Sequence, residues 1–454
     1  MTRPPSTTRT APGVIPDEVI RDERSSGFIL HIRLADDVAI DSRRSFMSSL
    51  TDALDELTDG TGGGRSASVA VGFGKRFFTS LPISPAGFDD APLPAGELID
   101  ADIALYIMYN AEWRLGEFLE RLATLGSGIV ASVVSHAGFQ RTDRRELGRF
   151  LDGLRNPKAA DRAEVVFVDR DRNPEEPVEA EGGTYMTTMR VLQDLAAWNA
   201  LAVADQERMI GRRKDDGSRL DLAAGTAIVD ETTINGASCP FNSHVAKLGP
   251  RGEHNDAVRI FRRGIPFINL TPTGTVEAGL LFVAFHNAMS PIRTMVDDWM
   301  LNPDFPTPGT GQDALLENHI ISITHTGFYF VPSRVGFYGA QFFEGHQHDE
   351  RCLGHVAVHK RVLDASGSPI RAERGGFTFQ LFDGSNNPAS DPFTTDSSGR
   401  ALSPAVPVGN TYILREISSR TGFDPAPDLS IDLSGHRALA TVDNHATATN
   451  PGYR

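Results

Sequence analysis

Two stretches of the chain alternate strand and helix patterns in the same order. In the first stretch the order strand–helix–strand–strand–helix–strand falls at residues 27–34, 43–57, 67–72, 101–109, 112–125 and 129–134. Within 43–57, apolar residues such as Phe46, Leu50 and Leu54 recur at helical spacing, which predicts one buried face. This order of elements is typical of a ferredoxin-like unit.

The same order recurs after a linker at 169–183 that is rich in acidic residues, Pro and Gly. The second series falls at residues 185–192, 194–210, 259–261, 279–284, 292–300 and 328–332. We expect Met295 and Trp299 to point inward. The pattern predicts an α+β fold with two ferredoxin-like subdomains of the dimeric α+β barrel type, at residues 25–180 and 181–350. Residues 1–24, rich in Pro, Thr and Arg, are expected to form a disordered arm.

The pattern changes near residue 355. Short alternating strands at 356–359, 377–381 and 412–414 are separated by Gly-, Ser-, Asn- and Pro-rich turns, and helix patterns are missing. This predicts a third domain, an all-β sandwich at residues 355–450.

Composition narrows the functional classes. The net charge of −15 argues against nucleic-acid binding, because a phosphate backbone needs a basic surface. The two cysteines, Cys239 and Cys352, do not suffice for a disulfide scaffold or a structural zinc site. The longest apolar run, 279–285, is too short to span a membrane, and the N-terminus lacks the apolar core of a secretory signal. We therefore expect a cytoplasmic location.

Two segments carry candidate chemistry. Asp152 lies on a loop between Phe150-Leu151 and Gly153, ahead of an Asn156-Pro157 stop. His244 is followed at some distance by a basic pair, Arg262-Arg263. Taken singly, an Asx-turn and a structural histidine explain these residues at least as well as a functional site.

A series of short motifs links these segments. In order they are Val71-Gly72-Phe73-Gly74, Phe150-Leu151-Asp152-Gly153 with Asn156-Pro157, Gly183-Thr184-Tyr185 with Arg190, Gln206 to Arg212, His244, Arg262-Arg263-Gly264, Gly279 to Phe282, and Thr326 to Pro332. Over about residues 26–345 the series resembles the dye-decolorizing haem peroxidases. The resemblance implies an enzyme that binds haem b and reduces hydrogen peroxide through a ferryl intermediate. Its reducing substrates would be bulky aromatic donors such as dyes and phenolics.

The resemblance implies roles for individual residues. His244 would be the proximal iron ligand, and Asp313 is a candidate acceptor for its other ring nitrogen, although a solvated loop acid fits Asp313 equally well. Asp152 would move the peroxide proton, and Arg262 would stabilise the departing hydroxide. Arg263 is the alternative to Arg262, which we prefer because the apolar Phe261 precedes it.

Other residues have less definite roles in this resemblance. Lys247, Arg251 and Arg212 (or Arg213) would bind the haem propionates, or simply form a solvated basic face. Electron transfer from dyes is open to Trp113, Trp198, Trp299 and Tyr329, although Trp198 and Trp299 fit core positions better. Arg149 departs from the family, which usually has Gly three residues before the aspartate, so the position of Asp152 over the haem is in question.

The third domain resembles the Cna B-type or SpaA-like β-sandwiches of surface proteins. Lys360, Glu416 and Asn444 carry this resemblance. In that family the lysine and asparagine can form an isopeptide bond catalysed by a buried acid. The alternative is a plain sandwich that binds a protein partner or caps the peroxidase. Resemblance to surface proteins also leaves an exterior location open.

Two other functions remain open beside the peroxidase. One is a haem-binding or iron-handling protein on the same scaffold, and the other is an inactive scaffold that serves as a binding module through the third domain. The presence of both Asp152 and Arg262 favours the peroxidase, because a haem carrier needs neither. The oligomeric state is open as well; ferredoxin-like sheets often associate, so a homo-oligomer is one option by analogy.

Overall fold

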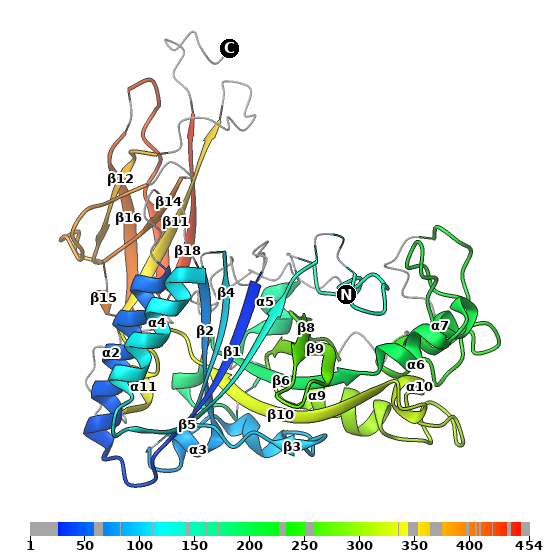
Figure 1. Cartoon of the computed structure of the whole chain (residues 1–454). Helices are drawn as coiled ribbons and strands as arrows, with labels where there is room; N and C mark the ends of the chain where they lie inside the picture. The colour runs from blue at the N-terminus through cyan, green and yellow to red at the C-terminus, as the bar shows by residue number, and fades with distance from the viewer. Residues whose placement is uncertain are drawn as a thin grey trace. The chain divides into compact units, whose positions relative to one another are not determined.

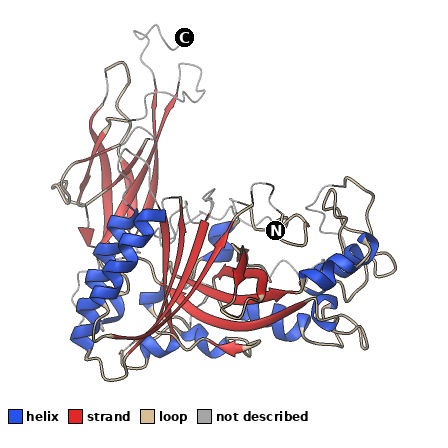
Figure 2. Cartoon of the chain, in the orientation of Figure 1, coloured by secondary structure: helices blue, strands red, loops and turns tan. Residues whose placement is uncertain are grey.

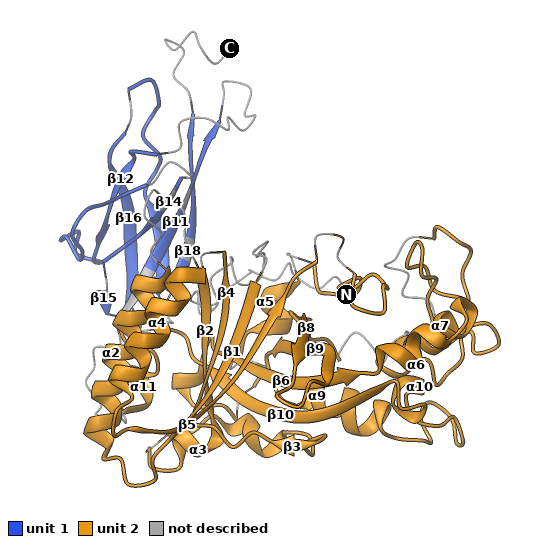
Figure 3. Ribbon diagram, in the orientation of Figure 1, with its two compact units in different colours: residues 1–12, 346–454 blue, residues 13–345 orange. Residues whose placement is uncertain are grey.

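The structure is a computed structural model of the whole chain (Figure 1). It describes residues 26–58, 67–81, 83–110, 112–141, 143, 145–158, 161–169, 172–173, 175–226, 233–249, 258–334, 336–343, 353–363, 375–395, 399–404, 406–407, 410–419, 421–433 and 437–445. The predicted arm at 1–24 lies outside these residues. The chain divides into two compact units, one of residues 13–345 and one of residues 1–12 with 346–454 (Figure 3).

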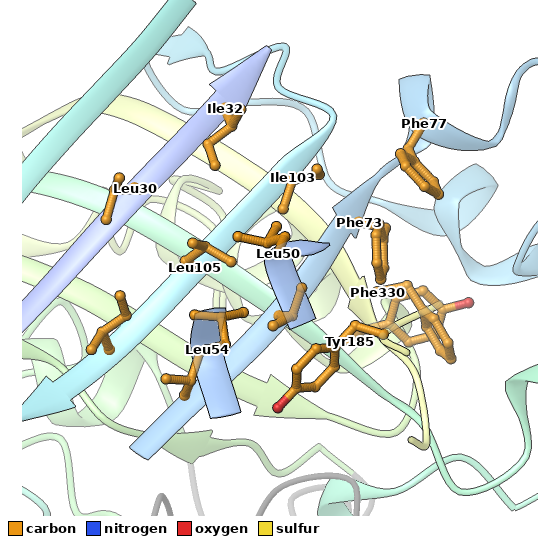
Figure 4. Packing of buried hydrophobic residues seen from close by; sticks show 14 of the residues in the cluster. Leu30, Ile32, Leu50, Leu54, Phe73, Phe77, Ile103, Leu105, Tyr185 and Phe330 are labelled. Carbon is orange, nitrogen blue, oxygen red and sulfur yellow. The ribbon is translucent and has the colours of Figure 1, made fainter. Parts of the chain in front are cut away.

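The first half of the larger unit follows the expected order of elements. Its main elements are β1 (Ser26–Leu34), α2 (Ile40–Thr58), β2 (Ala67–Gly74), β4 (Ile103–Tyr109), α4 (Glu112–Leu125) and β5 (Val130–Phe139). Three small elements lie between β2 and β4: α3 (Lys75–Phe78), η1 (Ala86–Asp90) and β3 (Glu97–Leu98). Leu50 and Leu54 of α2 are fully buried and pack over Leu30 and Leu105 of the strands (Figure 4). The apolar face of α2 thus covers one face of the sheet.

The second half repeats this arrangement with more irregular helices. Its strands are β6 (Thr184–Gln193), β7 (Phe261–Arg262), β8 (Ile265–Leu270), β9 (Val276–His286) and β10 (Ile321–Val331). Its helices are α6 (Leu195–Ala200), α7 (Val203–Ile210), α8 (His244–Lys247), α9 (Ser290–Arg293), the π-helix η3 (Thr294–Met300) and α10 (Ala314–Glu317). The segment between the halves contains α5 (Arg162–Val166) and the short η2 (Val178–Ala180), and α11 (Ala340–Phe343) follows β10. Met295 and Trp299 are buried, as predicted.

The single helix predicted at 194–210 is wrong, because the chain forms α6 and α7 with a break at Leu201 and Ala202. Leu201 and Ala202 are extended, with ψ of 145° and 149°. The Gln206 Nε2 donates to the carbonyls of Trp198 (2.8 Å) and Leu201 (3.4 Å). This side chain satisfies carbonyls that a continuous helix would have paired with its own backbone.

One ten-stranded sheet joins the two halves. Its strand order is β5-β1-β4-β2-β10-β6-β9-β7, with β3 paired to β10 and β8 to β9. The halves meet where β2 pairs with β10 through Gly74 and Tyr329. In Figure 1, β6 and β10 run side by side as long central strands. In the first half, β1 lies between β5 and β4, and β2 is next to β4. In the second half, β6 lies in the same way between β10 and β9, and β7 is next to β9.

The described part of the smaller unit contains strands and no helix (Figure 2). One four-stranded sheet is formed by β11 (Leu353–Leu363), β14 (Arg400–Leu402), β15 (Val406–Pro407) and β18 (Arg437–His445). The other is formed by β12 (Thr378–Phe382), β13 (Phe393–Thr394), β16 (Asn410–Ser418) and β17 (Leu429–Leu433). Buried residues of both sheets, such as Val358, Leu381 and Leu433, form one apolar core. Across the part of the chain that the structure describes, no helix is both long and apolar enough for a membrane span.

Candidate active site

A cavity of about 840 Å³ lies against the second half of the sheet. Its lining includes apolar side chains from β6, β9, β10, η3 and the segments beside β7 and α8, namely Met189, Val191, Leu248, Ile260, Phe282, Met295, Val296, Ile321 and Ile323. It also includes His244, Asp152, Arg212 and Arg262. The volume lies within the range of protein sites for small molecules and cofactors. The structure therefore brings the predicted iron ligand and both predicted catalytic residues to one cavity.

His244 is held by a buried carboxylate. Its Nδ1 lies 2.7 Å from Asp313 Oδ2, and the Asp313 side chain is fully buried. Asp313 is fixed in turn, because its Oδ1 accepts a hydrogen bond from the Leu315 backbone N–H (2.9 Å) at the start of α10. The Asp313 N–H donates to the Met300 carbonyl (3.0 Å). With Nδ1 engaged, Nε2 is the ring nitrogen that His244 presents to the cavity, and the predicted partner is in place.

Lys247 does not support its predicted role as a propionate ligand. Its ammonium is buried and donates to the carbonyls of Asn302 and Phe305, both at 2.6 Å. Lys247 is not among the residues that line the cavity. The reason is tertiary packing, because the two hydrogen bonds of Lys247 fix the 302–305 turn to α8. Arg251, the other predicted ligand on this side, lies outside the described residues.

A side-chain amide ties the Asp152 loop to β7. The Asn156 Nδ2 donates to the Arg262 carbonyl (2.9 Å), and the Arg262 N–H donates to Asn156 Oδ1 (3.0 Å). Asp152 itself is exposed, and its Oδ1 accepts the Gly153 N–H at 2.6 Å. Sequence reasoning treated Asn156 only as part of a loop stop, and its spacing from Arg262 carried no signal of this pairing.

Strand alternation separates the two neighbouring arginines. Arg262 lines the cavity and Arg263 does not. Arg262 is opposite Ala284 in the register of β7 and β9, and successive side chains of a strand point to opposite faces. The geometry thus favours Arg262 over Arg263 for a role in the cavity.

Arg149 adopts the backbone conformation that glycine favours. Its φ is +70°, in the left-handed region. Two hydrogen bonds hold it there, from the Arg149 N–H to the Glu146 carbonyl (2.9 Å) and from Arg145 Nη1 to the Arg149 carbonyl (2.7 Å). The departure from the family pattern is accommodated at this position, at the cost of backbone strain.

The polar side of the cavity carries an excess of positive charge. Burial, together with the neighbouring Arg262 and Arg219, lowers the pKa of Arg212 to about 10. Arg212 is 6% exposed, and its Nη1 donates to the Gly217 carbonyl. Arg213 does not line the cavity and donates to Ser218 and to the Arg219 carbonyl. Because like charges repel, this region favours an anionic group, and Arg212 rather than Arg213 is placed to meet it.

The four aromatic residues considered for electron transfer lie in different environments. Trp113 is 62% exposed, whereas Tyr329 is fully buried. Trp198 is 1% exposed, lines the cavity and donates from Nε1 to the Gly148 carbonyl (3.3 Å). Trp299 is buried and stacks on Phe305 at 5.4 Å. Among the four, only Trp113 is open to direct contact with a bulky dye.

These residues fit a haem group. An apolar lining suits the faces of a porphyrin, and Arg212 suits one of its carboxylates. An imidazole with one nitrogen bonded to a carboxylate is the arrangement found for histidines that ligate metals. The donor set and the cavity thus match the cofactor that the resemblance implied.

Comparisons with known proteins find similarity to dye-decolorizing peroxidases. Residues 143–336 match the family model described as Dyp-type peroxidase, C-terminal. A dye-decolorizing peroxidase of Rhodococcus erythropolis is 29% identical over 205 residues, which are 45% of this chain and 52% of that protein. One of Thermobifida fusca is 32% identical over 182 residues, 37% of this chain and 42% of that protein. The chain spans about half the length of the curated relatives it matches.

Solved structures share the fold of the larger unit. A DyP-type peroxidase of Streptomyces coelicolor covers 75% of this chain and 100% of its own, with a TM-score of 0.58 at 22% identity. Ferric DtpA of Streptomyces lividans covers the same shares with a TM-score of 0.59 at 21% identity. A DypB variant of Rhodococcus jostii in complex with heme covers 68% of this chain and 94% of its own, with a TM-score of 0.54 at 23% identity. The chain therefore has the mixed α+β fold of DyP-type peroxidases.

Proposed function

We propose that this protein is a haem-dependent peroxidase that reduces hydrogen peroxide at the expense of bulky aromatic donors. The observation that carries the proposal is the pairing of His244 with Asp313 at a cavity that also contains Asp152 and Arg262. The similarity of residues 143–336 to DyP-type peroxidases supports the same reaction.

His244 and Asp313 would hold the cofactor. The Asp313 carboxylate accepts the Nδ1 proton, which fixes the tautomer and would leave the Nε2 lone pair free to ligate the haem iron. A hydrogen bond to a carboxylate also raises the basicity of the imidazole. When bound, the haem supplies the redox chemistry with peroxide, and Arg212 pairs with a haem carboxylate.

Asp152 and Arg262 would act on the peroxide itself. The Asp152 carboxylate accepts a proton from one peroxide oxygen and returns it to the other, directly or through a water molecule. The Arg262 guanidinium stabilises negative charge on the departing oxygen. The Asn156 amide fixes the Asp152 loop to β7, so the Asp152 and Arg262 segments keep a constant spacing. General acid–base catalysis of this kind contributes roughly 10²–10⁴-fold to a rate.

The test combines haem binding, peroxide reaction and dye oxidation. We expect the full chain to give a Soret band with haem and to bleach an anthraquinone dye with hydrogen peroxide. His244→Ala should lose the Soret band of the ligated form, and Asp152→Asn or Arg262→Leu should keep haem and lose roughly 10²–10⁴-fold in peroxide reactivity. Arg263→Leu is the matched control, since this neighbour does not line the cavity.

The two alternatives give distinct results in the same assay. A Soret band without dye bleaching indicates a haem carrier, and the lack of a Soret band indicates a binding scaffold. Full dye oxidation by Asp152→Asn and Arg262→Leu contradicts the proposed roles, and so does an equal loss in Arg263→Leu.

We further propose that each half of the larger unit is a ferredoxin-like subdomain and that the smaller unit is a β-sandwich. The strand orders β5-β1-β4-β2 and β10-β6-β9-β7 support the first assignment, because both follow the same connectivity. Two four-stranded sheets with one shared apolar core support the second.

For the smaller unit we propose an internal isopeptide bond between Lys360 and Asn444. Lys360 Nζ contacts Asn444 Oδ1, and the Asn444 Nδ2 donates to Glu416 Oε1 at 2.8 Å. Glu416 Oε2 lies 3.7 Å from Lys360 Nζ, and the side chains of this pair are fully buried. The parallel pairing of β11 and β18 supports the contact, because Lys360 is opposite Val442, two residues from Asn444.

The chemistry needs no further reactant. Burial lowers the pKa of Lys360 to about 8, so an appreciable fraction of the amine is neutral and nucleophilic near this pH. Nζ bonds to the Asn444 side-chain carbonyl carbon, the bond from that carbon to Nδ2 breaks, and ammonia leaves. Glu416 carries the proton from the attacking amine to the leaving nitrogen.

Intact mass tests the bond. We expect a mass lower than that of the sequence by one ammonia molecule, and the full sequence mass in Lys360→Arg and Glu416→Ala. Arg361→Gln is the control, because Arg361 lies on the same strand in an exposed pair with Asp443. A wild-type mass equal to that of the sequence contradicts the bond.

A further inference from the structure

A buried phenol lies on the face of the sheet opposite the cavity. Tyr329 of β10 is fully buried, and its Oη lies 2.7 Å from Nδ1 of His31 on β1. Its surroundings are apolar and include Met186, Leu281 and Val331. Burying two polar groups in such surroundings is costly unless they hydrogen-bond to each other. The pair therefore forms a hydrogen-bonded unit of phenol and imidazole.

The His31 imidazole is uncharged at neutral pH and can accept a proton. Burial, together with the neighbouring His136 and His325, lowers the pKa of His31 to about 3. Burial also raises the pKa of Tyr329, so the phenol stays protonated until it is oxidised. Removal of one electron makes a phenol a strong acid, and His31 is then the acceptor in contact with it.

Further histidines connect His31 with the surface. The rings of His31 and His136 are 5.8 Å apart, and those of His136 and His325 are 6.3 Å apart. His325 Nε2 lies 3.8 Å from Glu97 Oε2, whose side chain is 79% exposed. A small cavity of about 10 Å³ adjoins His31 and His136, close to the least space that one water molecule needs. Within the described residues, the buried Nε2 of His136 has no hydrogen-bond partner, so such a water would have a protein partner.

The phenol and the large cavity lie on opposite faces of the same sheet. Met189 lines both the large cavity and the small one beside His31. Thr188 precedes it on β6 and points to the opposite face. A Cβ on Gly327 would lie 2.7 Å from Tyr329 Oη and 2.9 Å from Thr188 Oγ1. Glycine at this position thus lets the phenol lie against the strand behind Met189.

We infer that Tyr329 and His31 form a redox-active pair that takes up an oxidising equivalent generated in the cavity. The inference rests on the proposed function, because hydrogen peroxide is the oxidant. Reduction of one hydrogen peroxide to two molecules of water takes two electrons and two protons, and the protons come from the solvent. When no donor is bound, the haem in the cavity would supply one electron and Tyr329 the other; the O–H bond of Tyr329 breaks, and its proton binds to Nδ1 of His31. A later donor returns one electron to Tyr329, and the proton moves back from His31 to the phenol oxygen.

This role differs from direct contact with a dye. Tyr329 is fully buried, so a bulky donor does not reach it. The pair is instead a reversible store that draws oxidising equivalents away from the cavity lining, where Met189, Met295 and Met300 are susceptible to oxidation. We therefore expect the pair to prolong activity in peroxide without raising the initial rate of dye oxidation.

The test uses the haem-loaded full chain, mixed with hydrogen peroxide without a donor and frozen for electron paramagnetic resonance. We expect a tyrosyl radical signal that is lost in Tyr329→Phe and lowered in His31→Gln, which removes the strong base. Tyr106→Phe is the matched control, because Tyr106 is also fully buried but donates to the Arg263 carbonyl (3.0 Å) instead of an imidazole. Tyr329→Phe should also be inactivated after fewer turnovers, with its initial rate of dye oxidation unchanged. A tyrosyl signal that persists in Tyr329→Phe overturns the inference.

The Soret band and dye oxidation of the same samples separate this inference from the proposed function. Dye oxidation without a radical at Tyr329 overturns the pair and leaves the peroxidase standing. If peroxide does not react at all, the proposed function fails, and the haem-free protein is oxidised instead with a flash-generated ruthenium(III) complex. The yield of tyrosyl radical must then still fall in Tyr329→Phe and not in Tyr106→Phe. Equal yields in these two variants overturn the pair on its own.

Discussion

Asp313 performs two separable tasks, which allows its role at His244 to be tested by two substitutions. Its Oδ1 caps α10 through the Leu315 N–H, and its Oδ2 bonds to His244 Nδ1. Asp313→Asn keeps an oxygen for the cap, because Asn and Asp are equally good at this position. The asparagine NH₂ then faces Nδ1 and donates to it, which moves the imidazole proton to Nε2. This is the wrong tautomer for binding iron.

The expected magnitudes follow from these contacts. Loss of a partner that orients a metal-binding histidine costs roughly 10–100-fold in metal affinity. This corresponds to about 1.4–2.8 kcal/mol of binding free energy. Asp313→Asn should therefore bind haem this much more weakly while the free energy of unfolding changes little. Asp313→Ala also loses the cap, which lowers the free energy of unfolding by about 1 kcal/mol more than Asp313→Asn does.

Haem titration followed by the Soret band and denaturant unfolding of the haem-free chain measure the two effects. Asp194→Ala is the matched control, because the Asp194 Oδ1 caps a different helix, α6, through the Ala197 N–H (2.8 Å). We expect it to lower stability by about 1 kcal/mol and to leave haem affinity unchanged. Wild-type haem affinity in Asp313→Asn would refute the argument that this carboxylate sets the tautomer of His244.

Three further predictions follow from the same structure. Asn156→Ala should slow the peroxide reaction and lower the free energy of unfolding by about 1–3 kcal/mol, because both backbone groups of Arg262 lose their partner. Asn156→Asp keeps the acceptor and should be intermediate. Stopped-flow kinetics and unfolding curves measure the two effects. Arg149→Gly should raise the free energy of unfolding by about 0.5–1 kcal/mol, since relief of left-handed strain exceeds the flexibility that glycine adds; a lower value would refute the strain. Burial lowers the pKa of His31 to about 3 and that of His286 to about 4, whereas a histidine in the unfolded chain has a pKa of about 6.5. Below pH 6.5 the unfolded chain therefore binds more protons than the folded chain. The stability of the larger unit should therefore fall as the pH drops from about 6.5 to about 4, and a pH-independent unfolding curve across this window would contradict it.

Local patterns were sufficient where an element depends on its own residues. The helix predicted at 112–125 has the same bounds as α4, because its apolar residues recur along one face and the element needs little help from elsewhere. The helix predicted at 194–210 failed for the opposite reason. The Gln206 amide captures carbonyls across the break, and a side-chain contact of this kind leaves no trace in the periodicity.

At the candidate site, the sequence indicated which residues could take part but not where their side chains point. The motif series pointed to Asp152, His244 and Arg262, and all three line the cavity. Lys247 is also a basic residue near His244, yet its ammonium donates to two carbonyls of the 302–305 turn. A charge can be read from one position, whereas the partner that satisfies it depends on which segment packs against it.

The sequence by itself determined the alternation of strands and helices, the change to an all-β pattern near residue 355 and the kinds of side chain available for chemistry. These properties depend on neighbours within one or two turns of a helix or along one strand. Only the tertiary structure decided that Asp313 meets His244 and that Tyr329 meets His31. The second pair is separated by 298 positions, and contacts over such distances arise from the packing of the whole sheet and not from any local periodicity.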